Sequence, residues 1–178
     1  MTGHTADTGD VTVFMESSLA IFDVEVLKTE PVTAFIAGID DVCQPIRVVI
    51  PKDGKTMLVT ARASNALLAF DADKLLTCPE DALLASVQVG TSPVGLIFAK
   101  NEMRILTADS NDFTQANAMS GISVVDVNAA LSGEEANLGQ FATGLFLREF
   151  STSPDGSIII VSDYRSKSVP AIEVCILP

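Results

Sequence analysis

One short sequence pattern recurs four times along the 178-residue chain, and this repetition constrains the fold more than any other feature. The pattern VTARASNALLAFD at residues 59–71 aligns without a gap with residues 11–23 and with residues 161–173. The remaining copy, residues 106–126, aligns once eight residues are inserted. Four copies in the same order predict an array of one repeated structural unit.

Two positions keep the same chemistry in every copy. The second position carries a hydroxyl group, so that the aligned residues are Thr12, Thr60, Thr107 and Ser162. Each copy closes on an acid, namely Asp23, Asp71, Asp126 and Glu173. Catalytic acids and bases need unlike environments, whereas repeated positions have like ones. We therefore predict a structural role for these acids, such as capping the short helical segments expected after Asp71 and Asp126.

The apolar segments of each unit predict strands. They are five to seven residues long, rich in Val, Ile, Leu and Thr, and bounded by Gly, Pro, Asn and Asp. Four such segments per unit, with a period of about 50 residues, are typical of β-propeller blades. A β-sandwich of about twelve strands would explain the strands but not their repetition. The predicted fold class is all-β, a partial β-propeller of about three to four four-stranded antiparallel blades.

The repeats also divide the chain. Residues 1–10 are predicted to be a disordered N-terminus, and propeller repeats span residues 11–178. Within the repeats we expect a partial blade at 11–38, blades at 45–90 and 93–144, and a partial blade at 147–178.

Two segments carry a family resemblance. Residues 153–163 (SPDGSIIIVSD) and 51–61 (PKDGKTMLVTA) resemble the P-D-G-x-x-x-Y-V-T-N core of YVTN-repeat, lactonase-like seven-bladed propellers. The resemblance covers residues 11–174, but Ala61 and Asp163 replace the Asn of the pattern, which puts ligand chemistry based on that Asn in doubt. It implies the C-terminal half of a seven-bladed propeller.

Half a ring leaves unpaired strand edges and an uncovered blade face, and both favour self-association. Three explanations stay open: a C-terminal fragment of a longer propeller, two copies that assemble into one ring, or an open array. The N-terminus lacks the basic and apolar regions of a signal peptide, although members of the resembling family are often secreted, so no compartment is assigned.

Composition excludes several partners. The net charge of −12 argues against nucleic acid and anionic membranes, and no apolar run approaches the ~20 residues that span a bilayer. Cys43, Cys78 and Cys175 have neither zinc-site nor disulfide-framework spacing. The single histidine, His4, lies in the polar terminus, so we predict no catalytic residue.

The candidate binding residues follow the second strand of each unit, where the copies differ from one another. Variable hairpins on a repeated scaffold are how repeat proteins build binding surfaces. A charged pair in the last unit's first strand, Arg148–Glu149, is a further candidate, which could face channel water, pair internally or contact a ligand. The eight-residue insertion within residues 110–121 is the leading candidate loop. The candidate residues are Arg62, Asn65, Asp109, Asn111, Asp163, Tyr164, Arg148 and Glu149.

Two functions are compatible with these residues. The first is a non-catalytic scaffold, without cofactor, that presents a surface to a protein, a glycan or another small ligand. The alternative, which rests on the family resemblance, is a lactonase- or cyclase-like hydrolase with a cation site in the propeller channel. Asp109, Asn111 and Asp163 carry the oxygen ligands that such a site would use for Ca²⁺.

Overall fold

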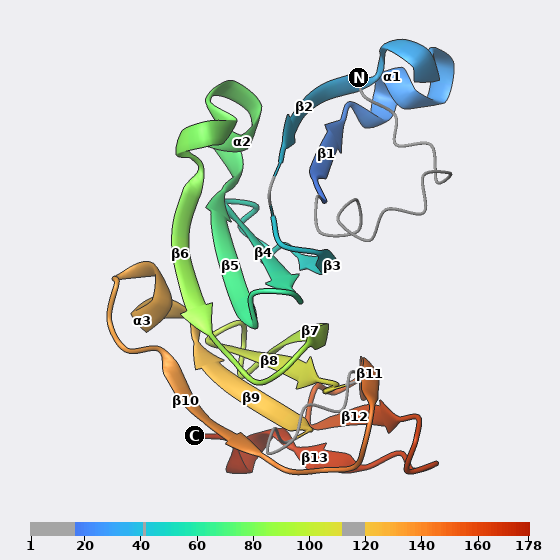
Figure 1. Cartoon of the computed structure of the whole chain (residues 1–178), viewed down its shortest axis with the longest axis vertical. Helices are drawn as coiled ribbons and strands as arrows, with labels where there is room; N and C mark the ends of the chain where they lie inside the picture. Colours follow the sequence, from blue (N-terminus) through green and yellow to red (C-terminus); the bar gives the residue numbers. More distant parts are fainter. Residues whose placement is uncertain (1–16, 41, 112–119) are drawn as a thin grey trace.

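A computed structural model describes residues 17–40, 42–111 and 120–178, and it contains four antiparallel sheets that follow one another along the chain (Figure 1). Blade 1 contains β1 (Leu19–Phe22) and β2 (Phe35–Ile39). Blade 2 contains β3 (Pro45–Val49), β4 (Thr56–Ala61), β5 (Ala66–Asp71) and β6 (Leu83–Gln88). Blade 3 contains β7 (Pro93–Ala99), β8 (Arg104–Asp109), β9 (Gly121–Asp126) and β10 (Asn137–Phe141). Blade 4 contains β11 (Leu147–Thr152), β12 (Ile158–Asp163) and β13 (Ala171–Glu173).

The blades share one orientation. In Figure 1 the first strands β3, β7 and β11 lie along one side of the molecule, while β6 and β10 lie on the opposite side. Strand β7 packs against both β3 and β11. Strands run next to one another in sequence order within each sheet. The predicted all-β, partial propeller-like fold is confirmed.

Short helices leave the third strands. Helices α1 (Val24–Thr29), α2 (Ala72–Thr77) and α3 (Val127–Leu131) each begin directly after one of the repeated acids. The Asp71 carboxylate accepts hydrogen bonds from the amides of Asp73 and Lys74, each at 3.0 Å. Asp23 and Asp126 cap α1 and α3 in the same way, which confirms the predicted structural role of these acids. Glu173 differs, because no side-chain bond caps the 3₁₀ turn η4 (Val174–Ile176).

Proline-led 3₁₀ turns follow the first two helices, at η2 (Pro31–Thr33) and η3 (Pro79–Asp81). No helix among the described residues is long and apolar enough to cross a membrane. The expected N-terminal segment and residues 11–16 of the first repeat lie outside the part of the chain that the structure describes.

Strand register fixes which residues are equivalent between blades. The second strands end on Ala61, Asp109 and Asp163, which pair with Pro45, Pro93 and Leu147 respectively. One residue earlier stand Thr60, Ala108 and Ser162, so the alignment of Thr107 with Thr60 and Ser162 is wrong by one residue. A one-residue shift in a strand moves a side chain to the other face of the sheet. Thr107 accordingly bonds to Asp109, two residues on and on the same face.

The core lies between the blades. One apolar cluster joins blades 1 and 2, a second joins blades 2 and 3 through residues such as Leu58 and Ile105, and a third joins blades 3 and 4 through Leu106 and Ile159. Strand β4 is buried on both faces and β8 nearly so, whereas β3 is largely exposed and β12 alternates between exposed and buried residues. Burial of both faces holds the first strands side by side and positions the site described next.

Candidate functional site

A cavity of about 260 Å³ opens where the first strands of blades 2, 3 and 4 meet. Its lining residues are Ile46, Arg47, Arg62, Val94, Arg148 and Glu149. We call this cavity the arginine pocket. Its lining residues include three arginines and one glutamate, so positive groups outnumber negative ones by two among them, in a chain of net charge −12.

The repeat explains how these residues come together. Ile46, Val94 and Arg148 each follow the residue that pairs with the end of the second strand, so they occupy equivalent positions in three blades. The next position carries Arg47, Gly95 and Glu149. Because blade 3 has glycine there, it contributes no side chain between Arg47 and Glu149. A Cβ at Gly95 would lie 2.8 Å from the Arg148 carbonyl, so the close packing of β11 on β7 also requires glycine.

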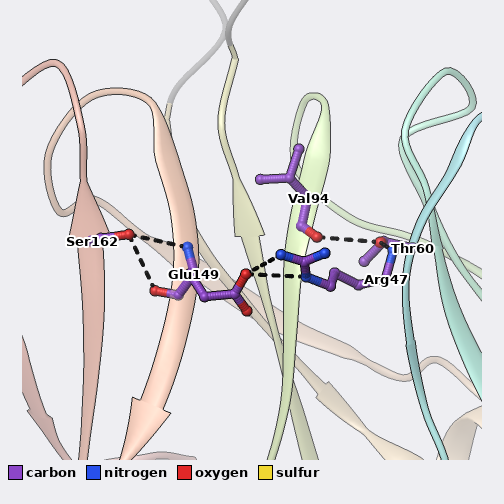
Figure 2. A network of polar contacts seen from close by, with 5 residues as sticks. All are labelled: Arg47, Thr60, Val94, Glu149 and Ser162. Carbon is purple, nitrogen blue, oxygen red and sulfur yellow. Dashed lines mark hydrogen bonds and ion pairs between the residues drawn. The ribbon is translucent and has the colours of Figure 1, made fainter.

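An ion pair joins blade 2 to blade 4 at this position (Figure 2). The Arg47 Nε donates to Glu149 Oε2 at 3.1 Å, and Arg47 Nη2 contacts the same oxygen. This hydrogen bond is the main cause that raises the pKa of Arg47. Hydroxyl groups at equivalent positions hold the backbone of both residues. The Thr60 hydroxyl accepts a hydrogen bond from the Arg47 amide at 3.0 Å, and the Ser162 hydroxyl accepts one from the Glu149 amide at 3.2 Å. Both charged side chains are about half exposed, so the pair orients them more than it stabilises the fold.

The other two arginines of the pocket lie close enough to repel each other. Burial, and then the positive charge of Arg148, lower the pKa of Arg62. Arg148 stacks over the Phe146 ring with its guanidinium carbon 5.1 Å from the ring centroid, and Arg165 contacts the same ring at 5.0 Å. Tyr164 packs edge-on against Phe146 at 5.8 Å. These contacts hold Arg148 in place and put Arg165 beside the pocket, so four of the chain's five arginines line the pocket or adjoin it.

Left-handed backbone precedes the first strand of blades 2, 3 and 4. Gln44, Ser92 and Phe146 have φ angles of 60°, 53° and 61°. The carbonyls of these residues accept hydrogen bonds from the amides that follow the second strands, in the pairs Arg62–Gln44, Ser110–Ser92 and Tyr164–Phe146. The backbone conformation is therefore the same in each blade while the side chains differ. The positive φ of Phe146 is a repeated feature of the fold and does not by itself mark a functional residue.

Asp109 is buried beside Gly90, in the connection between blades 2 and 3. Its carboxylate accepts hydrogen bonds from Ser123 Oγ at 2.6 Å, Thr107 Oγ1 at 2.8 Å and Gln140 Nε2 at 2.8 Å. Burial raises the pKa of Asp109 to about 6, while the bonds from these groups and from the Gly90 amide oppose the rise. A Cβ at Gly90 would overlap Asp109 Oδ2 and Gln140 Nε2. The glycine that ends blade 2 is thus required by an acid of blade 3.

Asp163 holds the equivalent position in blade 4 with fewer partners. It is buried, yet neither of its carboxylate oxygens has a hydrogen bond of normal geometry among the described residues. Burial raises the pKa of Asp163, opposed by the nearby Gly144 amide and the hydroxyls of Thr143 and Ser168. A Cβ at Gly144 would overlap the Asp163 carboxylate, so this glycine repeats the packing of Gly90.

The remaining candidate residues are spread over different junctions. Asn65 accepts a hydrogen bond from the Ser92 amide at 2.8 Å, which ties the turn of blade 2 to the start of blade 3. The Asn111 amide donates to the Thr91 carbonyl at 3.0 Å, and most of the inserted loop that follows lies outside the described residues. Within the described chain no group of three or more His, Cys, Asp or Glu side chains lies close enough to hold a metal.

Of the predicted binding residues, the structure brings Arg62, Arg148 and Glu149 into one pocket and puts Tyr164 beside it through Phe146. Sequence reasoning missed Arg47. The signal was present, because PIRVVI and LREFST align so that Arg47 and Glu149 share one repeat position. The candidate cation ligands Asp109 and Asp163 lie in different blades, each beneath a different glycine.

Comparison with known proteins supports the fold. No protein-family model matches the chain, and no curated protein matches its sequence. Similar solved structures include a functionally unknown protein from Desulfotomaculum acetoxidans, with a TM-score of 0.65 and 11% identity over 88% of this chain and 43% of that chain. A "putative 6-phosphogluconolactonase" from Bacteroides fragilis has a TM-score of 0.62 and 16% identity over 76% of this chain and 36% of its own.

Hydrazine synthase from Kuenenia stuttgartiensis has a TM-score of 0.60 and 15% identity, covering 76% of this chain and 34% of that chain. At these identities the likeness concerns the fold alone. The chain spans between 34% and 43% of the length of these three structures.

Proposed function

We propose that the protein is a non-catalytic propeller module that binds a small anionic ligand, a carboxylate or a phosphate, in the arginine pocket. The observation that carries the proposal is geometric: Arg62 and Arg148, two like charges, line one cavity. Burial lowers the pKa of Arg62, and the positive charge of Arg148 adds to this effect. An anion between them would replace their repulsion with charge-assisted hydrogen bonds, for which the planar guanidinium is well suited.

The size and field of the pocket support a small ligand. Its volume of about 260 Å³ lies below the roughly 300–1,000 Å³ of drug-sized sites. The net charge of −12 repels extended polyanions, while the local positive excess attracts a compact anion. Glu149 competes for Arg47, so the pocket binds an anion more weakly than it would without this ion pair.

Isothermal titration calorimetry with citrate, inorganic phosphate and uncharged glucose tests the proposal and separates the carboxylate from the phosphate. Arg62→Gln and Arg148→Gln should each weaken anion binding by roughly 10- to 100-fold, since a hydrogen bond to a charged group contributes about 1.5–3 kcal/mol. Glu149→Gln should tighten binding, because it releases Arg47. Lys55→Gln is the matched control: it removes one positive charge from the hairpin at the opposite end of β4.

Anion binding that none of the pocket variants changes would contradict the proposal, as would an equal loss in Lys55→Gln, which would indicate unspecific charge attraction. Failure of both anions to bind at millimolar concentration would also overturn it.

The alternative is a lactonase- or cyclase-like hydrolase with a cation in the channel, supported by the fold likeness to the Bacteroides protein alone. In that function Asp109, Asn111 and Asp163 would hold Ca²⁺. Calcium would then raise the melting temperature, the protein would hydrolyse members of a lactone panel, and alanine at Asp109 and Asp163 would remove both effects. A protein that is indifferent to calcium and inert toward every lactone is not such a hydrolase.

A further inference from the structure

Each internal junction joins two equivalent faces. In blades 2 and 3, the side chain three residues before the end of the second strand points toward the following blade: Leu58 is 2% exposed and Leu106 is 0% exposed. We call this the forward face. Its counterpart in blade 4 is Ile160, which is 39% exposed.

The opposite, backward face shows the same contrast at the other end of the array. The residue before each repeated acid packs against the preceding blade, with exposures of 4% for Phe70, 0% for Val125 and 6% for Ile172. The equivalent residue of blade 1 is Phe22, which is 42% exposed. Among the described residues, no sheet covers the backward face of blade 1 or the forward face of blade 4.

Both uncovered faces extend beyond one residue. Ile158 lies two residues from Ile160 on the same side of β12 and is also exposed. On blade 1, Phe35 packs edge-on against Phe22 with ring centroids 5.9 Å apart, and Val24 begins the helix beside them, all three exposed. Contiguous exposed apolar groups of this kind mark association surfaces.

We propose that the forward face of blade 4 in one copy stacks on the backward face of blade 1 in a second copy of this chain. The occupant follows from the repeat: the positions that meet at each internal junction are the positions left uncovered at the two ends. Ile160 would take the place of Leu106, and Phe22 would take the place of Ile172. This head-to-tail contact is independent of anion binding.

Such an interface joins two different surfaces, so it either closes when two copies make both contacts or continues as a filament. Light scattering coupled to size exclusion, with the full chain at about 10–100 µM, should therefore show a dimer or a larger species. Ile160→Lys and Phe22→Lys should each shift the dissociation concentration upward by tenfold or more. Leu76→Lys is the matched control, because Leu76 is exposed on α2 of blade 2 and belongs to neither end face.

Mixing the two variants tests the head-to-tail geometry. Ile160→Lys keeps an intact backward face and Phe22→Lys keeps an intact forward face, so the mixture should form a dimer through one restored junction. A contact in which one patch meets itself would not be restored by mixing. Circular dichroism of each variant confirms that it is folded, and Ile160→Thr replaces Ile160→Lys where lysine unfolds the chain. A wild-type monomer at the highest concentration overturns the proposal, and so does equal dissociation of Leu76→Lys.

Discussion

The buried carboxylate of Asp109 predicts an unusual pH dependence of stability. Burial raises its pKa from the ordinary value of 3.8 to about 6 in the folded protein. The folded state therefore binds the proton more tightly than the unfolded state does. Because the folded pKa is the higher of the two, the stabilising contribution is present below the unfolded value and is lost as pH rises through about 6.

The size of the effect follows from the shift. One pKa unit corresponds to about 1.4 kcal/mol, so the whole shift corresponds to about 3 kcal/mol. Between about pH 7.5 and about pH 4.5, where most of the titration occurs, Asp109 should contribute about 2 kcal/mol to the free energy of unfolding.

Urea unfolding of the wild type and Asp109→Asn over this pH range measures the contribution. The asparagine does not titrate, and the other carboxylates, including Asp163 with its own raised pKa, are common to both proteins. The wild type should gain stability relative to Asp109→Asn as the pH falls. Parallel profiles, or a relative gain as the pH rises, would refute the assignment of a raised pKa to this buried group.

Two further predictions concern the repeated positions. Gly90→Ala should destabilise the protein by about 2 kcal/mol or more in urea melts, because the added Cβ overlaps a buried carboxylate and an amide. Gly54→Ala is the control, because its Cβ meets nothing within 4 Å and the substitution costs only the left-handed backbone conformation. Gly54→Ala should therefore destabilise the protein less. Asp71→Ala should cost about 1 kcal/mol through the lost helix cap, and Asp126→Ala should cost more because it also breaks the 2.7 Å ion pair with Arg104; equal losses would contradict the second role.

The sequence predicted the strands and the caps because both depend on local pattern. Apolar segments bounded by turn residues specify strands wherever they stand, and an acid before a short helix caps it by accepting hydrogen bonds from the amides of the first turn. Asp71 and Asp126 could thus be assigned a role without any tertiary contact. Even the error at Thr107 was local, since one residue of misalignment in a strand exchanges the two faces.

The contacts that Asp109 makes with Gln140 and Gly90 could not be predicted, because they join residues that are distant in the sequence. Asp109 is bonded to Gln140, which is 31 residues away, and it dictates Gly90 in the preceding blade. From the sequence, Asp109 looked like a variable hairpin residue. Strand pairing shows that Asp109 and Asp163 are equivalent, because each ends the second strand of its blade. Non-local contacts of this kind leave no periodic signal in the chain.

The arginine pocket depends both on the local repeat and on contacts between blades. The sequence therefore predicted Arg62, Arg148 and Glu149 but not Arg47. The scaffold repeats, so the position that holds Arg47 in blade 2 must hold something in blades 3 and 4, and there it holds Gly95 and Glu149. Each of the three residues has a structural use, since Gly95 lets β11 pack closely on β7 and Arg47 pairs with Glu149. These three residues also leave blade 3 without a side chain between two long charged ones, beside Arg62 and Arg148. The proposed anion site therefore rests on side chains that differ between blades at one repeated backbone position.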